Sequence, residues 1–202
     1  MHSDEGYIKY KLQWKQHHLP DDALLRSLIT YRDALKEKNL IGIYPDGIGF
    51  GNISIRIPES TEFYISGTQT GNIEKTQVKH YARVTDYSFS DNALYCEGEV
   101  KASSEALTHG AFYMFGHRIH AVMHVHNSVL WNALKGLVPT TAHLVAYGTP
   151  EMAFEIQRQL IQGDLFEKQI IIMAGHQDGI FTFGANLEVA YKVLLDYYNI
   201  FH

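Results

Sequence analysis

Residues 52–57, 62–66, 83–89 and 93–99 read NISIRI, EFYIS, RVTDYSF and ALYCEGE, and this part of the sequence decides the fold. Each run is short and rich in β-branched and aromatic residues, and turn signals such as Pro-Glu-Ser and Ser-Asp-Asn separate the runs. Strands that follow one another so closely leave no room for the crossover helices that parallel pairing needs. The segment therefore predicts a meander of antiparallel strands.

Helical patterns lie on both sides of this meander. Each begins at a good capping residue and continues with apolar residues at helical spacing. They are residues 21–39, 103–115, 149–163 and the segment after Asn186. Strand-like runs lie between them at residues 120–126, 169–174 and 180–183. This mixture of helices and adjacent antiparallel strands predicts a layered α/β or α+β domain with a mostly antiparallel sheet.

Length and composition favour one domain. At 202 residues and 46% hydrophobic content, the chain can bury a full core without disulfides. We expect a single domain at residues 21–202, preceded by an N-terminal extension at residues 1–20. The only cysteine is Cys96, so no intrachain disulfide can form. The first twenty residues have no apolar signal segment, and no stretch is apolar enough to span a membrane. We therefore expect a cytoplasmic protein with no membrane partner.

The charge balance argues against a nucleic-acid partner. Only 17 Lys and Arg residues face 22 Asp and Glu residues, which gives a formal net charge of -5. Such a chain has no excess of basic side chains with which to neutralise a phosphate backbone. A small anionic substrate stays compatible with this composition.

Three histidines form the strongest chemical signal. His124 and His126 are two apart in a strand-like run, so both side chains lie on one face while Met123 and Val125 point to the other. His176 follows the apolar run 169–174 at a glycine-bounded turn. Three imidazoles with an open fourth position suit catalytic zinc, although imidazole also binds other divalent transition metals. With 12 histidines in the chain, a coincidental His-x-His pair is the alternative.

Glu105 is the candidate general acid and base, because a carboxylate beside a metal-bound substrate can move a proton next to a carbonyl. Ordinary capping of the helix that starts at Ser103 is the alternative for this residue. The segments GFGNIS (49–54) and SGTQTG (66–71), together with Ser103 and Ser104, combine glycines with hydroxyl and amide groups. Such stretches can bind a phosphate through backbone N–H groups, but taken singly each is more typical of a plain turn.

Taken in order, these motifs resemble the class II aldolase/adducin family. The stretches that carry the resemblance are GNIS with Arg56, FYISGTQTG, ASSEALTHGAFY, HAVMHVHN, YGTPEM and MAGHQDGIFTFG, from about residue 21 to residue 183. The resemblance implies a three-layer α/β/α domain around a mostly antiparallel sheet, assembled as a homotetramer with active sites between subunits. The family's enzymes include fuculose-phosphate aldolase, ribulose-phosphate 4-epimerase and methylthioribulose-phosphate dehydratase.

Residue by residue, the resemblance implies that a zinc ion binds His124, His126 and His176, and that Glu105 is the catalytic acid and base. It assigns a sugar or sugar-phosphate substrate to the residues that match the family's phosphate site. These are Asn52, Gly67 or Gly71, Ser103 and Ser104. The expected reaction is retro-aldol cleavage of a short ketose or ketose phosphate. The alternatives are 4-epimerisation or dehydration at the same metal site, or a non-catalytic adducin-like interaction domain.

Two departures from the family pattern leave open which loop residue binds a phosphate and which residue takes the place of the family's neighbour-subunit tyrosine. The SGTQTG loop is longer than the corresponding turn of the best-known aldolases. Fuculose-type members also place a tyrosine of the neighbouring subunit ahead of the stretch that matches YGTPEM, where this chain reads TTAHLVAYG. His143 and Tyr147 are the candidates for that position.

Overall fold

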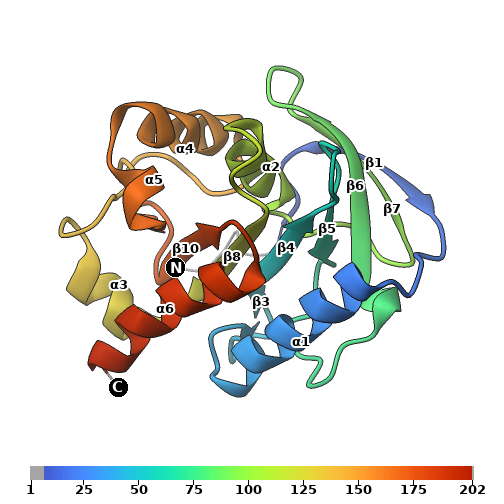
Figure 1. Ribbon diagram of the computed structural model, residues 1–202, viewed down its shortest axis with the longest axis horizontal. Helices are drawn as coiled ribbons and strands as arrows, with labels where there is room; N and C mark the ends of the chain where they lie inside the picture. Colours follow the sequence, from blue (N-terminus) through green and yellow to red (C-terminus); the bar gives the residue numbers. More distant parts are fainter. Residues whose placement is uncertain (1–6, 202) are drawn as a thin grey trace.

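The protein is described by a computed structural model that covers residues 7–201, and an eight-stranded sheet forms its centre (Figure 1). Its strands lie in the order β1-β7-β6-β5-β4-β8-β10-β9. All neighbouring pairs are antiparallel except β1 with β7. The strands are β1 (Lys11–Gln16), β4 (Asn52–Arg56), β5 (Phe63–Ser66), β6 (Tyr81–Ser88), β7 (Ala93–Gly98), β8 (Ala121–His126), β9 (Ile170–Ile172) and β10 (Gly179–Gly184). The mostly antiparallel sheet is as predicted.

Helices cover both faces of the sheet, which gives three layers (Figure 1). Helices α2 (Ala106–Met114) and α4 (Pro150–Gln162) pack on one face, and α1 (Ala23–Glu37) and α6 (Leu187–Phe201) pack on the other. Shorter elements are α3 (Ser128–Leu134), α5 (Leu165–Lys168), the 3-10 turn η1 (Val78–His80) and a small pair of strands, β2 (Gly42–Ile43) and β3 (Gly49–Phe50). The three-layer α/β fold expected from the sequence is confirmed.

The helix boundaries follow from their capping residues. Asp22 accepts a hydrogen bond from the N–H of Leu25 at 2.8 Å, which fixes the start of α1. Thr149 caps α4 with Pro150 in its first turn, and Gly163 ends it, as predicted. Helix α2 starts later than the expected Ser103, because its first helical residue is Ala106. Glu105 sits at the N-cap position, but its side chain makes no capping hydrogen bond.

Strand β1 was not predicted from the sequence. Residues 1–20 were expected to be an extension, yet within them β1 adds a parallel strand to the edge of the sheet beside β7. Its residues are mostly exposed, so the run lacks the apolar face by which other strands were recognised. Tyr10 anchors the segment before it, since its buried hydroxyl donates to the carbonyl oxygen of Ser103 at 2.7 Å. The segment before β1 therefore reaches the start of α2.

Alternation along two central strands places polar side chains on one face. Ile53 and Ile55 of β4 join the core beneath α1 and α6, while Ser54 between them bonds to a residue of α2. On β8, Met123 and Val125 enter the same apolar core, as the sequence predicted for them. In the portion that the structure describes, no helix is long and apolar enough to cross a membrane.

Candidate active site

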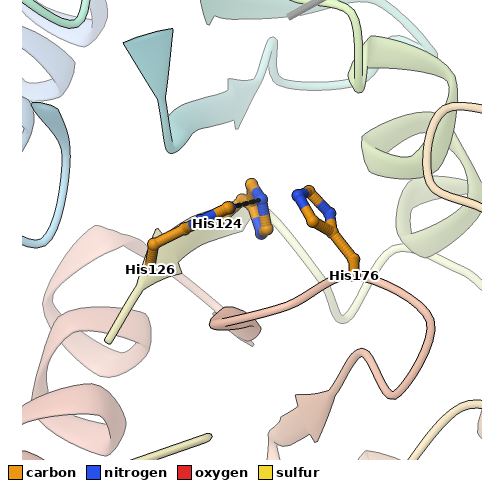
Figure 2. Close-up of side chains that lie close together, drawn as sticks. All are labelled: His124, His126 and His176. Atoms are coloured by element: carbon orange, nitrogen blue, oxygen red, sulfur yellow. Dashed lines mark hydrogen bonds between the residues drawn. The ribbon is translucent and has the colours of Figure 1, made fainter. Parts of the chain in front are cut away.

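Three histidine rings converge at the end of β8 (Figure 2). His124 and His126 come from β8, and His176 comes from the turn between β9 and β10. All three are buried, and one potential ligand nitrogen from each lies within 4.8 Å of the others. The Nε2 atoms of His124 and His126 are 3.0 Å apart. The sequence expectation that residue 176 lies beside the 124/126 pair is therefore met by the geometry.

The other ring nitrogens of the strand pair have their own partners. Nδ1 of His124 lies 3.2 Å from the carbonyl oxygen of Ile180, and this oxygen can only accept, so Nδ1 carries the hydrogen. In the neutral ring, Nε2 then presents a lone pair to the cluster. Nδ1 of His126 lies 2.6 Å from the hydroxyl of Tyr44. Both rings are thus oriented by hydrogen bonds on the side away from the cluster.

The donor atoms at the centre fit a divalent cation. Nε2 of His124 faces both Nε2 of His126 at 3.0 Å and Oε2 of Glu105 at 2.6 Å. A neutral imidazole nitrogen and a carboxylate are both electron-pair donors, so they repel each other unless a cation or a proton lies between them. Imidazole nitrogens are favoured ligands of Zn²⁺ and of several other transition metals. His124, His126 and His176 therefore have the chemistry and spacing of a metal centre.

Glu105 faces the histidines and does not cap the helix. The residue is 2% exposed, with Oε2 2.6 Å from Nε2 of His124 and Oε1 3.5 Å from Nδ1 of His176. Burial by itself raises the pKa of this carboxyl group, but the positive charge and the hydrogen bonds of the His124 and His176 rings in their protonated form lower it by more, and a cation held among the rings would act in the same direction. The net pKa lies well below the usual range of a glutamate. Glu105 is thus an ionised carboxylate beside the three imidazoles.

The residues expected to bind substrate lie together next to Glu105. They line a narrow pocket of about 20 Å³, which has room for about one water molecule. The pocket's lining includes Asn52, Gly67, Gly71, Ser103, Ser104 and Glu105. A wider hollow of about 350 Å³ adjoins it and shares the lining residues Gly49, Gln69 and Gly71. The structure brings the predicted set together from the start of β4, the loop after β5 and the segment before α2.

Close packing leaves no room for a side chain at Gly67 or Gly71. A Cβ atom at Gly71 would lie 2.0 Å from the carbonyl oxygen of Gly42, and one at Gly67 would lie 2.4 Å from the side chain of Val100. Side chains at these positions would push the loop at residues 67–71 away from its neighbours. The close packing keeps this loop against the narrow pocket.

Two residues that touch the site, Tyr44 and His109, were not predicted from the sequence, and Tyr147 was predicted only as a candidate for the position of the family's neighbour-subunit tyrosine. Tyr44 bonds to His126 as described above, and the ring of Tyr147 lies 4.3 Å from that of His176, centroid to centroid. His109 is fully buried one turn along α2 from Glu105 and bonds to Asn52. The i to i+4 spacing of Glu105 and His109 was a signal for His109, because such residues share one helix face. Tyr44 lies in a loop and gave no such signal.

Comparisons with known proteins give a match to one family. The sequence profile described as Class II Aldolase and Adducin N-terminal domain matches residues 46–201. Among curated proteins, none matches the chain at a significant level.

Several solved structures share the fold. An L-fuculose 1-phosphate aldolase is 21% identical, with a TM-score of 0.67, and the match covers 91% of this chain and 84% of that chain. A sugar-phosphate aldolase from Thermotoga maritima is 17% identical, with a TM-score of 0.61 and coverage of 88% and 94%. YgbL from Escherichia coli, whose description leaves aldolase, epimerase and decarboxylase open, is 16% identical, with a TM-score of 0.62 and coverage of 86% and 84%. At these identities the likeness establishes the fold alone.

Proposed function

Since the chain belongs to the class II aldolase and adducin family, we propose that it is a metal-dependent aldehyde-lyase. Its reaction is the retro-aldol cleavage of a short ketose or ketose phosphate to a dihydroxyacetone-type ketone and an aldehyde. One observation carries the proposal: three buried imidazoles and the ionised Glu105 converge beside a polar pocket. An interaction domain has no physical need for this costly convergence of polar groups.

The metal ligands in this proposal are His124, His126 and His176, and zinc is the first candidate. When bound, the ion would supply a Lewis acid that stabilises negative charge on the substrate's carbonyl oxygen. The Ile180 carbonyl orients the ring of His124. Tyr44 orients the ring of His126 in the same way.

Glu105 is the catalytic acid and base in this proposal. As a carboxylate it accepts the proton that leaves the substrate hydroxyl when the aldehyde forms. The electron pair of the broken C–C bond stays with the ketone fragment, and Glu105 returns a proton to that carbon. Because Glu105 is buried, with 2% of the residue exposed, bulk water does not compete for its proton.

The substrate's polar end is assigned to the narrow pocket. Asn52, Ser103 and Ser104 offer amide and hydroxyl donors there, and the loop with Gly67 and Gly71 offers backbone groups. A phosphate group is larger than the water-sized narrow part, so it would extend into the adjoining hollow.

Domain organisation and assembly are part of the same proposal. Residues 21–202 form the family domain, and residues 1–20 form an extension whose strand β1 continues the sheet. The family resemblance supports a cytoplasmic homotetramer.

A substrate screen combined with metal analysis tests the proposal. We expect about one divalent metal ion per chain in the purified protein, and aldehyde release from at least one ketose or ketose 1-phosphate that stops when a chelator is added. His124→Ala and His176→Ala should lose the metal and stay folded, while the exposed His17→Ala serves as the matched control. Metal-free wild-type protein would favour the adducin-like interaction domain. A product with an inverted centre or a lost water would indicate epimerase or dehydratase chemistry at the same site.

A further inference from the structure

A chain of buried hydrogen bonds leads from the interior to Glu105. The hydroxyl of Tyr113 lies 2.6 Å from that of Ser54, which lies 2.6 Å from Nδ1 of His109. Nε2 of His109 lies 2.5 Å from Oδ1 of Asn52, and Nδ2 of Asn52 donates to Oε2 of Glu105 at 3.2 Å. All five residues are buried. The catalytic step proposed above uses only the last of them as an acid or base.

The chemistry of the groups fixes the direction of every bond. A carboxylate only accepts, so the amide nitrogen of Asn52 must face Glu105 and its oxygen must face His109. That oxygen also only accepts, so Nε2 of His109 carries the hydrogen. In the neutral ring Nδ1 then accepts from the hydroxyl of Ser54, and the hydroxyl of Tyr113 donates to Ser54. Reversing any one bond would place two acceptors or two donors face to face.

We propose that His109 is a positioning residue that holds the Asn52 amide with its nitrogen toward Glu105 and the narrow pocket. This inference rests on the function proposed above for Glu105 and Asn52. The Asn52 amide has a second N–H, and because Asn52 lines the narrow pocket, this second donor is available to an oxygen of the substrate. An amide does not pass a proton along, so the network sets orientation and is not a proton relay.

The buried surroundings keep His109 in the form that this role needs. Burial lowers the pKa of His109 to about 3, so the ring is neutral at neutral pH. A neutral ring in one tautomer donates from Nε2 and accepts at Nδ1. Phe181 packs edge-on against the ring at 5.4 Å between centroids, which limits its rotation.

Paired substitutions at residue 109 separate positioning from packing. His109→Gln keeps an N–H donor for Asn52, whereas His109→Leu has none and leaves the Asn52 oxygen unpaired. With a ketose phosphate that the wild type cleaves, we expect His109→Leu to lower kcat by about tenfold to a hundredfold with its metal content unchanged. His109→Gln should recover most of that loss. The exposed His17→Leu is the matched control and should behave as wild type. Equal kcat and KM in His109→Leu and wild type would overturn the proposal.

A spectroscopic measurement decides the inference without any turnover. In the wild-type protein with labelled histidine, long-range ¹H–¹⁵N correlations should show, among the Nε2–H rings, one that stays neutral throughout the range of about pH 6 to 8. His109→Gln should remove that signal, which assigns it. An Nδ1–H tautomer or a charged ring at residue 109 would overturn the positioning role even if the lyase activity is found. An absence of lyase activity with the expected tautomer would instead count against the proposed function.

If His109→Leu does not fold, Ser54→Ala tests the same hydrogen-bond network. It removes only the hydroxyl that donates to Nδ1 of His109. We expect kcat to fall by about threefold, as for the loss of one neutral hydrogen bond, with no change in metal content. An unchanged kcat in a folded Ser54→Ala protein would show that the outer part of the network does not position Asn52.

Discussion

The two faces of strands β4 and β8 differ in what they bury. The face under α1 and α6 is apolar, with Ile53 and Ile55 from β4 and Met123 and Val125 from β8. The opposite face of these two strands carries Asn52, Ser54, His124 and His126 beneath α2. Period-two alternation thus assigns one set of side chains to stability and the other to the site.

This difference shows where the fold tolerates polar burial. An apolar side chain that becomes fully buried stabilises the protein by about 1.5–3 kcal/mol, whereas a buried polar group costs free energy unless it is hydrogen-bonded. Ser54 and Asn52 meet that condition through His109, and His124 and His126 meet it through Ile180 and Tyr44. We therefore expect substitutions on the polar face to affect chemistry more than stability, and the reverse on the apolar face.

The largest effect is expected at Glu105 on the polar face. Glu105→Gln keeps the shape of the side chain but removes its ability to take up a proton, so kcat should fall by about 10²- to 10⁴-fold. The measurement is steady-state turnover of a ketose phosphate alongside metal analysis and a thermal melt. Metal content and melting temperature should stay near wild type. Unchanged turnover would show that Glu105 has only a structural role.

On the apolar face the expected pattern is the opposite. Leu28 of α1 is fully buried, and Leu28→Ala should lower the free energy of unfolding by about 2–5 kcal/mol because it leaves a cavity. Denaturant unfolding at one fixed protein concentration measures this change. Leu137→Ala, at a side chain that is 79% exposed, is the control and should change stability little. A fall in metal content of folded Leu28→Ala protein would show that the two faces are coupled.

Much of this division could be predicted from the sequence. The alternation of His124 and His126 with Met123 and Val125 placed the two imidazoles on one face, because a strand leaves no other choice. The convergence of residue 176 was expected from its place at a glycine-bounded turn and from the family resemblance, but tertiary contacts fix the direction of its ring. Tyr147, for example, packs on that ring from a loop that lies 29 residues earlier in the chain.

Other features left no local signal in the sequence. Strand β1 is mostly exposed, so its side chains follow no apolar period, and its pairing with β7 comes from backbone hydrogen bonds at the sheet edge. Arg32 lies in the amphipathic helix α1, and the sequence pattern did not indicate that its side chain is buried. Its guanidinium group donates to the carbonyl oxygens of Thr70 and Ile73, and so holds the loop beside the narrow pocket. Long-range polar contacts of this kind depend on the assembled fold.

A smaller effect is expected at Tyr44, on the outer side of the histidine cluster. Tyr44→Phe removes the hydroxyl 2.6 Å from Nδ1 of His126, so the ring loses an orienting partner. Loss of such a partner typically weakens metal binding by about 10- to 100-fold. Competition with a chromogenic chelator measures the affinity. Tyr31→Phe, which removes a phenol hydroxyl from α1 on the other face, is the matched control. Equal affinities in the two variants would limit Tyr44 to packing.

The smallest effect concerns pH and again separates the two faces. Burial lowers the pKa of His109 from 6.5 to about 3 in the folded protein. Below about pH 6.5 the unfolded chain therefore binds a proton that the folded protein excludes, so stability is present above that pH and is lost as the pH falls toward 3. At about pH 5.5 the loss from this one residue is roughly 1.4 kcal/mol. His109→Gln should remove that part of the pH dependence.

Denaturant unfolding at about pH 7.5 and 5.5 measures this loss, with a chelator present because metal binding is itself pH-dependent. The quantity to compare is the change in unfolding free energy between the two pH values, in wild type and in His109→Gln. His17→Gln, at an exposed histidine, should keep the wild-type change. Leu28→Ala should also keep it, because an apolar substitution lowers stability equally at both pH values. If His109→Gln keeps the full wild-type change, then His109 is not held neutral by burial, and the polar face owes its acid sensitivity to other groups.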